Sequence, residues 1–230
     1  MGGTKPKTRL IIMKLVIADK NYSSWSMRPW VLMKHFGIEF EEILIRLAQD
    51  DTDAKIRQFS PSGCVPALMD EQGRAVWDSL AIAETLAERH PQVALWPRDA
   101  AARGHARSVS AEMHSGFGAV RNHMPMKIRA HLPGQGAVPE VLAEVARIDE
   151  LWSECLAQYG GPFLFGEFTI ADAMFAPVVM RFNTYQPAVS EAARNYMKRV
   201  TELPAVAQWI ADAHADPRVI ARYEGPAATP

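Results

Sequence analysis

The sequence has few of the residues that bind metals or cross-link secreted proteins. Its 230 residues include two cysteines, Cys64 and Cys155, which form no C-x-x-C pair and no disulfide framework. Cysteine this sparse is typical of a reducing compartment, so we expect a cytoplasmic protein. The seven histidines form neither an H-E-x-x-H motif nor a cluster with cysteine, and we therefore expect no metal site.

The sequence also lacks a long apolar run and an excess of either charge. The apolar run "LIIMKLVIA", residues 10–18, is broken by Lys14 and is too short to cross a bilayer. No apolar segment with a cleavage site follows the initial "MGGTKPKTR", so we expect no signal peptide. The formal net charge of −1 supplies no basic field for nucleic acid. We expect neither a membrane nor a nucleic acid as a partner.

Residues 10–90 carry the pattern of an α/β domain with the order β-α-β-α-β-β-α. Apolar, β-branched or alternating stretches indicate its strands, and apolar residues at helical spacing indicate its helices. The expected elements are a strand at 10–18, a helix at 24–36, a strand at 40–47, a short helix at 52–60, strands at 65–70 and 74–78, and a helix at 79–90.

The rest of the chain carries helical patterning and almost no strand pattern. We expect a proline-containing linker at 91–104 and an all-α domain at 105–220. The expected helices lie near 101–131, 139–159, 169–184, 190–201 and 204–214.

Two short motifs in the α/β half allow both a structural and a functional interpretation. In "GCVPAL", Pro66 can simply begin a strand, but a cis Val65–Pro66 peptide would present the Val65 backbone to an extended peptide ligand. In "WDSLAI", Asp78 or Ser79 can cap a helix. The same two residues can also hold the carboxylate and the ammonium group of a ligand at that helix start.

Two further motifs open helices. Thr169 and Asp172 in "FTIADAMFAP" form a capping-box pattern, which we interpret as structural. In "NYSSWSMRPW", residues 21–30, Ser24 or Ser26 can cap the following helix. A serine hydroxyl in this turn could instead donate to a thiolate and lower the pKa of its thiol. A serine hydrolase is disfavoured because no G-x-S-x-G surrounds these serines.

The four motifs, in this order and spacing, resemble those of the glutathione transferase family over about Lys14–Pro217. The resemblance implies a thioredoxin-like N-terminal domain that binds glutathione, followed by an all-α domain. "SSWSMR" and "SGFGAVRN" (115–122) are similar to motifs of the zeta class, which includes maleylacetoacetate isomerases. Trp25 stands where zeta enzymes have cysteine. Arg181 is the nearest candidate for their substrate-binding arginine, but it follows Asp172 at a spacing three residues shorter than in zeta enzymes.

The resemblance also implies a role for each matching residue. Ser23 or Ser24 would activate the thiol of glutathione, with Ser23 preferred, while Arg28 would brace the start of the helix. Cys64 occupies a position where relatives often have Lys or Gln. The implied glutathione-binding residues are Cys64, Val65, Pro66, Asp78 and Ser79. The implied second-substrate pocket is Met113, Phe117, Arg121, Met124 and Arg181.

We therefore expect a homodimeric glutathione S-transferase that conjugates glutathione, its co-substrate, to a small electrophile in detoxification, without a metal. Two alternatives stay open. One is glutathione-dependent cis-trans isomerisation of the maleylacetoacetate type, in which Arg121 and Arg181 would bind carboxylates. The other is a non-catalytic ligand-binding or docking protein of the same fold.

Overall fold

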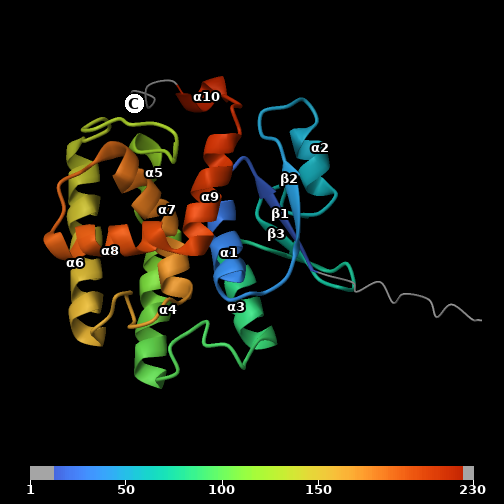
Figure 1. The fold of residues 1–230 in the computed structure, drawn as a ribbon. Helices are drawn as coiled ribbons and strands as arrows, with labels where there is room; N and C mark the ends of the chain where they lie inside the picture. Colours follow the sequence, from blue (N-terminus) through green and yellow to red (C-terminus); the bar gives the residue numbers. More distant parts are fainter. Residues whose placement is uncertain (1–12, 225–230) are drawn as a thin grey trace, which may run out of the picture.

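The first half of the chain folds in the predicted order β-α-β-α-β-β-α (Figure 1). The computed structural model describes residues 13–224, so residues 10–12 of the predicted first strand lie outside the described residues. The elements are β1 (Lys14–Ala18), α1 (Ser24–His35), β2 (Glu41–Ile45), α2 (Thr52–Arg57), β3 (Ala67–Met69), β4 (Ala75–Trp77) and α3 (Ser79–Arg89).

Strand β1 lies inside a four-stranded mixed sheet of order β2-β1-β3-β4. It runs parallel to β2 and antiparallel to β3, and β3 is antiparallel to β4. Leu15 and Ile17 point into the main core with α1 and α3, whereas Val16 points into a second cluster with Ile56 of α2. Side chains of a strand point alternately to the two faces of the sheet. Because both faces of β1 are covered, residues on both faces are apolar, which explains the continuous apolar run of this strand.

The second half of the chain is helical, as predicted. Its helices are α4 (Ala100–Ser115), α5 (Gly118–His123), α6 (Pro139–Tyr159), α7 (Ile170–Tyr185), α8 (Glu191–Glu202), α9 (Pro204–Ala215) and α10 (Ala221–Glu224). Helix α4 begins inside segment 91–104, the predicted linker. Within residues 13–224, no helix is both long and apolar enough to cross a membrane.

The prediction of one helix near 101–131 is wrong, because the helix is interrupted between α4 and α5. A Cβ on Gly116 would lie 2.7 Å from the carbonyl oxygen of Glu112, so only glycine fits there. Phe117 follows with a φ of +57°, in the left-handed region. The Glu144 carboxylate of α6 then accepts two N–H groups of the first turn of α5, at 3.1 and 2.7 Å. A long-range contact therefore fixes the start of α5.

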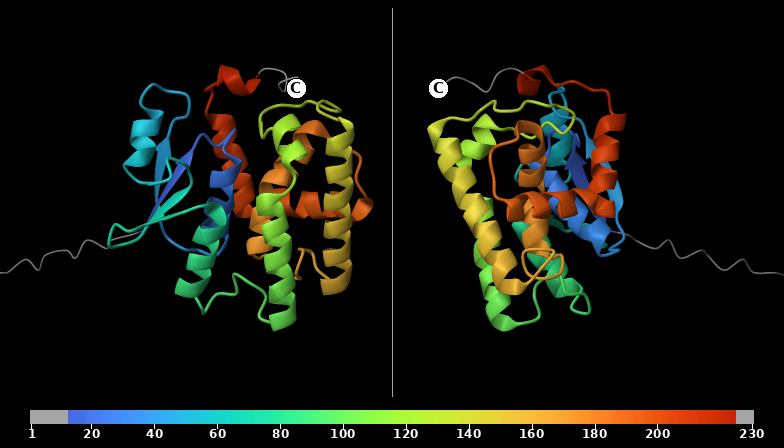
Figure 2. Two further views of the ribbon diagram at one scale, coloured as in Figure 1. Left: turned by 180° about the vertical axis from the view of Figure 1, so that it is seen from behind. Right: turned by 60° about the vertical axis from the view of Figure 1, so that its left-hand side comes forward.

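Helix α7 is almost wholly buried at the centre of the molecule, where it packs against α1 and α4 (Figures 1 and 2). Its start has the predicted capping box of Thr169 and Asp172. The Asp172 carboxylate also accepts the Leu164 N–H at 3.0 Å and the Tyr196 hydroxyl at 3.2 Å. Burial raises the pKa of Asp172 to about 6.

The two halves share one core and are tied together by an ion-pair cluster around the buried Lys20. Lys20, at the end of β1, bonds Glu42 of β2 at 2.9 Å and Asp212 of α9 at 2.7 Å. Its ammonium group lies 4.6 Å from the Trp30 ring and 5.4 Å from the Trp209 ring. These contacts hold α9 against the α/β domain and so fix the turn that follows Lys20.

Candidate functional site

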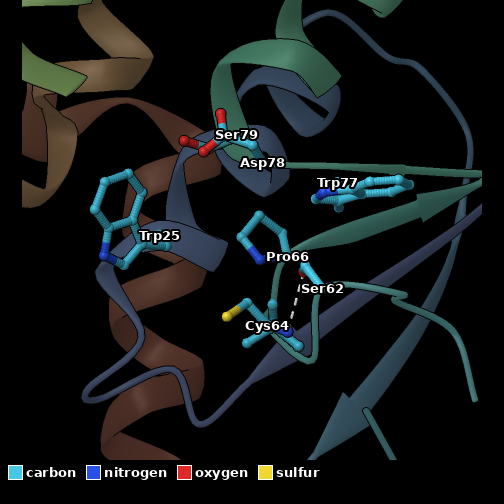
Figure 3. Close-up of a pocket in the computed structure, with 8 residues that line it drawn as sticks. Trp25, Ser62, Cys64, Pro66, Trp77, Asp78 and Ser79 are labelled. Carbon is cyan, nitrogen blue, oxygen red and sulfur yellow. Dashed lines mark hydrogen bonds between the residues drawn. The ribbon is translucent and has the colours of Figure 1, made fainter. Parts of the chain in front are cut away.

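A cavity of about 350 Å³ opens where the first turn of α1, the loop before β3 and the start of α3 meet. Figure 3 shows Trp25 and Trp77 on opposite sides of Pro66, with Asp78 and Ser79 at the start of α3. The cavity is lined by Trp25, Ser62, Cys64, Val65, Pro66, Trp77, Asp78 and Ser79. The structure thus brings together all five predicted glutathione-binding residues.

The loop before β3 forms one wall of the cavity. Its Val65–Pro66 peptide is cis, the geometry that the sequence pattern allows. The neighbouring Cys64 is an exposed free thiol, and its backbone N–H donates to the Ser62 hydroxyl at 3.2 Å. The loop therefore presents a peptide backbone and a thiol to the same space.

The start of α3 forms a second wall, and here the capping and ligand-binding interpretations are compatible. One Asp78 carboxylate oxygen caps α3 by accepting the Leu80 N–H at 2.8 Å, and the other lies 3.3 Å from Nε2 of His114. Asp78 has a φ of +75°, a strained conformation for a residue other than glycine. Ser79 is buried, and its hydroxyl oxygen accepts from Nη1 of Arg28 at 3.3 Å.

Ser24 and Ser26 lie inside the first turn of α1 and do not cap it, so the prediction that one of them is its cap is wrong. Ser23 occupies the N-cap position without a side-chain cap. Its hydroxyl donates to Ser26 Oγ at 2.7 Å, and Ser26 Oγ also accepts the Ala18 N–H at 3.1 Å. These bonds hold the turn against the end of β1, a contact that local sequence patterns do not specify.

Ser23 and Ser24 are both buried, and neither lines the cavity, whereas the adjacent Trp25 does. The Ser24 hydroxyl oxygen accepts from Nη2 of Arg181 at 3.1 Å. The proton of the Ser24 hydroxyl therefore stays available for another acceptor, while the Ser23 proton is directed to Ser26.

Three arginines surround this turn and give it a positive charge. The guanidinium groups of Arg28 and Arg121 lie 4.2 and 5.8 Å from the Trp25 ring, and the His114 ring meets Trp25 edge-on at 5.3 Å. Burial, then the charges of Arg181 and Arg121, lowers the pKa of Arg28 to about 9. Burial also lowers the pKa of Arg181 to about 10. Such an arrangement favours an anion nearby.

The predicted second-substrate residues do not gather on this cavity. Met113, Phe117 and Met124 lie in the hydrophobic core. Arg181 is buried and donates to the Met124 carbonyl oxygen at 2.6 Å. Arg121 is half-buried beside Trp25, and of the five it is the side chain best placed to meet a ligand.

Sequence reasoning missed three residues that line the cavity: Trp25, Ser62 and Trp77. Trp77 had a signal in the sequence, because it directly precedes Asp78 in "WDSLAI". In the structure its large apolar side chain is 44% exposed. Ser62 directly precedes the "GCVPAL" motif, yet nothing local distinguishes it from an ordinary turn serine. Among residues 13–224, no group of histidine, cysteine and acidic side chains could hold a metal ion.

The mixed sheet, the cis-proline loop and the helical second half together define a thioredoxin-like protein with a C-terminal helical domain. The family model of the glutathione S-transferase N-terminal domain matches residues 22–89, and that of the C-terminal domain matches residues 135–212. The chain belongs to the glutathione S-transferase family.

Individual relatives agree with this assignment. The chain is 29% identical over 167 residues to a probable maleylacetoacetate isomerase of Caenorhabditis elegans, covering 70% of this chain and 75% of the relative. A glutathione transferase homologue from Burkholderia, solved with bound glutathione, matches at a TM-score of 0.69 and 22% identity, covering 89% of this chain and all of that one. A bacterial maleyl pyruvate isomerase of the zeta class matches at a TM-score of 0.68 and 23% identity, covering 90% of this chain and all of that one.

Proposed function

We propose that this protein binds glutathione in the cavity and transfers its thiolate to a small electrophile. The observation that carries the proposal is the convergence of two separate segments on one cavity: Val65 in the loop before β3, and Asp78 and Ser79 at the start of α3. The solved relative with bound glutathione supports glutathione as the ligand.

The proposed binding mode follows the polarity of the cavity walls. The γ-glutamyl end of glutathione lies at Asp78 and Ser79. Its carboxylate accepts from the Ser79 hydroxyl, and its ammonium group pairs with the Asp78 carboxylate. The cysteinyl backbone lies along Val65, in the manner of an added strand. The glycyl end then lies toward Cys64, where a thiol replaces the Lys or Gln common in relatives.

Thiolate stabilisation is assigned to the Ser23–Ser24 pair at the N-terminus of α1. A hydroxyl donor and the positive end of a helix both stabilise a thiolate, and so lower the pKa of a thiol from about 8.5. Ser24 has a free proton because its oxygen already accepts from Arg181, whereas Ser23 would have to release Ser26. Alignment of the bound thiolate with the electrophile supplies the rest of the rate enhancement.

Glutathione-dependent isomerisation is the second candidate, and the position of Arg121 favours it. Arg121 is half-buried beside Trp25 and could hold a carboxylate of an unsaturated diacid. The thiolate would add to the double bond, the resulting single bond would rotate, and elimination would regenerate the thiolate and the isomerised double bond. The isomerase names of the relatives support this candidate.

The test of the proposal is a pH titration of the ultraviolet thiolate absorbance of bound glutathione. We expect a thiol pKa well below its free value in the wild type, and a loss of that shift in Ser23→Ala or Ser24→Ala. Bound glutathione with an unshifted thiol would contradict catalysis and favour a ligand-binding or docking protein. The sedimentation mass of the protein tests the proposed homodimer.

Product analysis separates the two catalytic candidates. Incubation with glutathione and chlorodinitrobenzene yields a stable conjugate if the protein is a conjugating transferase. Incubation with glutathione and maleate yields fumarate without net consumption of glutathione if it is an isomerase. Chromatography of both mixtures, with Ser23→Ala/Ser24→Ala as the control, assigns the reaction.

A further inference from the structure

Lys127 is a buried cation with a single weak partner. It lies in the loop after α5, with 6% of its side chain exposed. Within residues 13–224 its ammonium group has one acidic partner, the Glu224 carboxylate of α10, at 3.9 Å. This distance is longer than a hydrogen bond, and a buried ammonium group held so loosely is costly. The loop therefore holds a cation that a better-placed carboxylate would stabilise.

Tyr22 adds a hydroxyl donor at the same place. It directly precedes the Ser23–Ser24 pair, and its hydroxyl donates to Oε1 of Glu224, while Oε2 of Glu224 faces Lys127. One ammonium group and one hydroxyl thus converge on the two oxygens of one carboxylate. Such a pair of donors can bind a carboxylate from any source, including a ligand.

This pair of donors lies beside the proposed position of the thiolate. The Arg129 N–H donates to the Asn21 side chain at 2.9 Å, so the loop that carries Lys127 packs against the turn that leads into α1. The Arg181 side chain joins the same two segments, because it donates to Ser24 Oγ at 3.1 Å and to a backbone carbonyl oxygen of the loop at 2.6 Å. A carboxylate bound at Lys127 therefore lies next to the start of α1, where the thiolate is assigned.

The helix that supplies Glu224 is held by few contacts. Helix α10 is four residues long, none of them buried, and Figures 1 and 2 show it at the surface beyond the end of α9. Its Tyr223 ring lies 5.4 Å from the Tyr22 ring. The residue before α10 is fixed more firmly, because Ile220 is buried and its N–H donates to the Tyr22 hydroxyl at 3.3 Å. Helix α10 can thus move away while the chain up to Ile220 stays in place.

We propose that Lys127 and the Tyr22 hydroxyl form a subsite for a carboxylate of the second substrate, and that Glu224 occupies this subsite as an internal competitor. The inference rests on the proposed function and names the class of electrophile, which is one that carries a carboxylate. Such a substrate displaces Glu224, and α10 leaves the turn. A neutral electrophile gains nothing from the subsite.

Calorimetry with succinate tests the subsite without turnover, because this saturated diacid is not an electrophile. The titration uses the full chain, with and without glutathione, of the wild type, Glu224→Gln, Lys127→Met and Lys127→Arg. We expect Glu224→Gln to bind succinate about three- to tenfold more tightly, since an internal competitor lowers the fraction of sites that can bind. Lys127→Met should bind succinate at least about tenfold more weakly, and Lys127→Arg should retain most of the affinity.

Trypsin reports the release of α10, because Arg222 is exposed within this helix. We expect succinate to speed the cleavage after Arg222 in the wild type, whereas Glu224→Gln should be cleaved fast with or without succinate. Mass spectrometry identifies the cleaved bond. Glu202→Gln is the matched control, since Glu202 pairs with Lys198 at 3.8 Å on the surface of α8. It should behave as the wild type does in both assays.

Turnover links the subsite to the substrate. With chlorodinitrobenzene and its carboxylate-bearing analogue chlorodinitrobenzoate as electrophiles, Glu224→Gln should raise kcat/KM for the analogue alone. An unchanged succinate affinity in Glu224→Gln or Lys127→Met, or an equal change of kcat/KM for both electrophiles, would overturn the inference. A wild type that binds no glutathione, or conjugates neither electrophile, would instead contradict the proposed function, and the succinate titration would still decide whether the subsite exists.

Discussion

Replacing Asp172 by alanine tests how the start of α7 is held. The buried carboxylate accepts four hydrogen bonds, from the N–H groups of Leu164 and Thr169 at 3.0 and 2.8 Å and from the hydroxyls of Thr169 and Tyr196, both at 3.2 Å. Asp172→Ala leaves four buried donors without an acceptor. With about 1 kcal/mol or slightly more for each, we expect a loss of about 3–5 kcal/mol in the free energy of unfolding.

Urea unfolding followed by circular dichroism at about pH 8, where the carboxylate is ionised, measures this loss. For a chain of this size it corresponds to a fall of about 6–20 °C in the melting temperature. Asp99→Ala is the graded control, because Asp99 accepts a single N–H, from Ala102 at 2.7 Å, as the cap of α4. That variant should lose only about 1 kcal/mol. Equal losses in the two variants would refute the idea that the Asp172 network, rather than an ordinary cap, holds α7.

Three further predictions concern the same helix and the cavity. Burial raises the pKa of Asp172 to about 6, so the folded state binds this proton more tightly than the unfolded chain. The stabilisation from that proton is full below about pH 4 and is lost as pH rises through 6. In urea unfolding of Asp172→Asn, the free energy of unfolding should not show this fall with pH. Arg181→Met should cost about 2–3 kcal/mol in urea unfolding, because the Met124 carbonyl and Ser24 lose a buried donor, and a neutral result would contradict the network. Trp25→Cys should raise the isomerisation of maleate relative to Trp25→Phe, and equal rates would show that Trp25 does not limit this reaction.

The sequence predicted the elements whose signals are local. The continuous apolar run of β1 and the capping box of Thr169 and Asp172 each depend on neighbouring residues, and both appear as predicted. The fold class followed from the order of such elements. Val65, Asp78 and Ser79 could be selected for the same reason, since a strand start and a helix start carry recognisable residues.

The tertiary structure decided what depends on residues distant in sequence. Glu144 fixes the start of α5, and Met113 and Met124 pack in the core, so the predicted second-substrate residues do not line this cavity. Arg28 meets Ser79 across 51 positions of the chain. Local patterns specify hydrogen bonds and caps within a few residues, whereas a buried charge finds its partner only after the elements have packed. The sequence by itself therefore indicated the family and five of the eight residues that line the cavity, whereas the packing of distant elements placed the buried charges beside it.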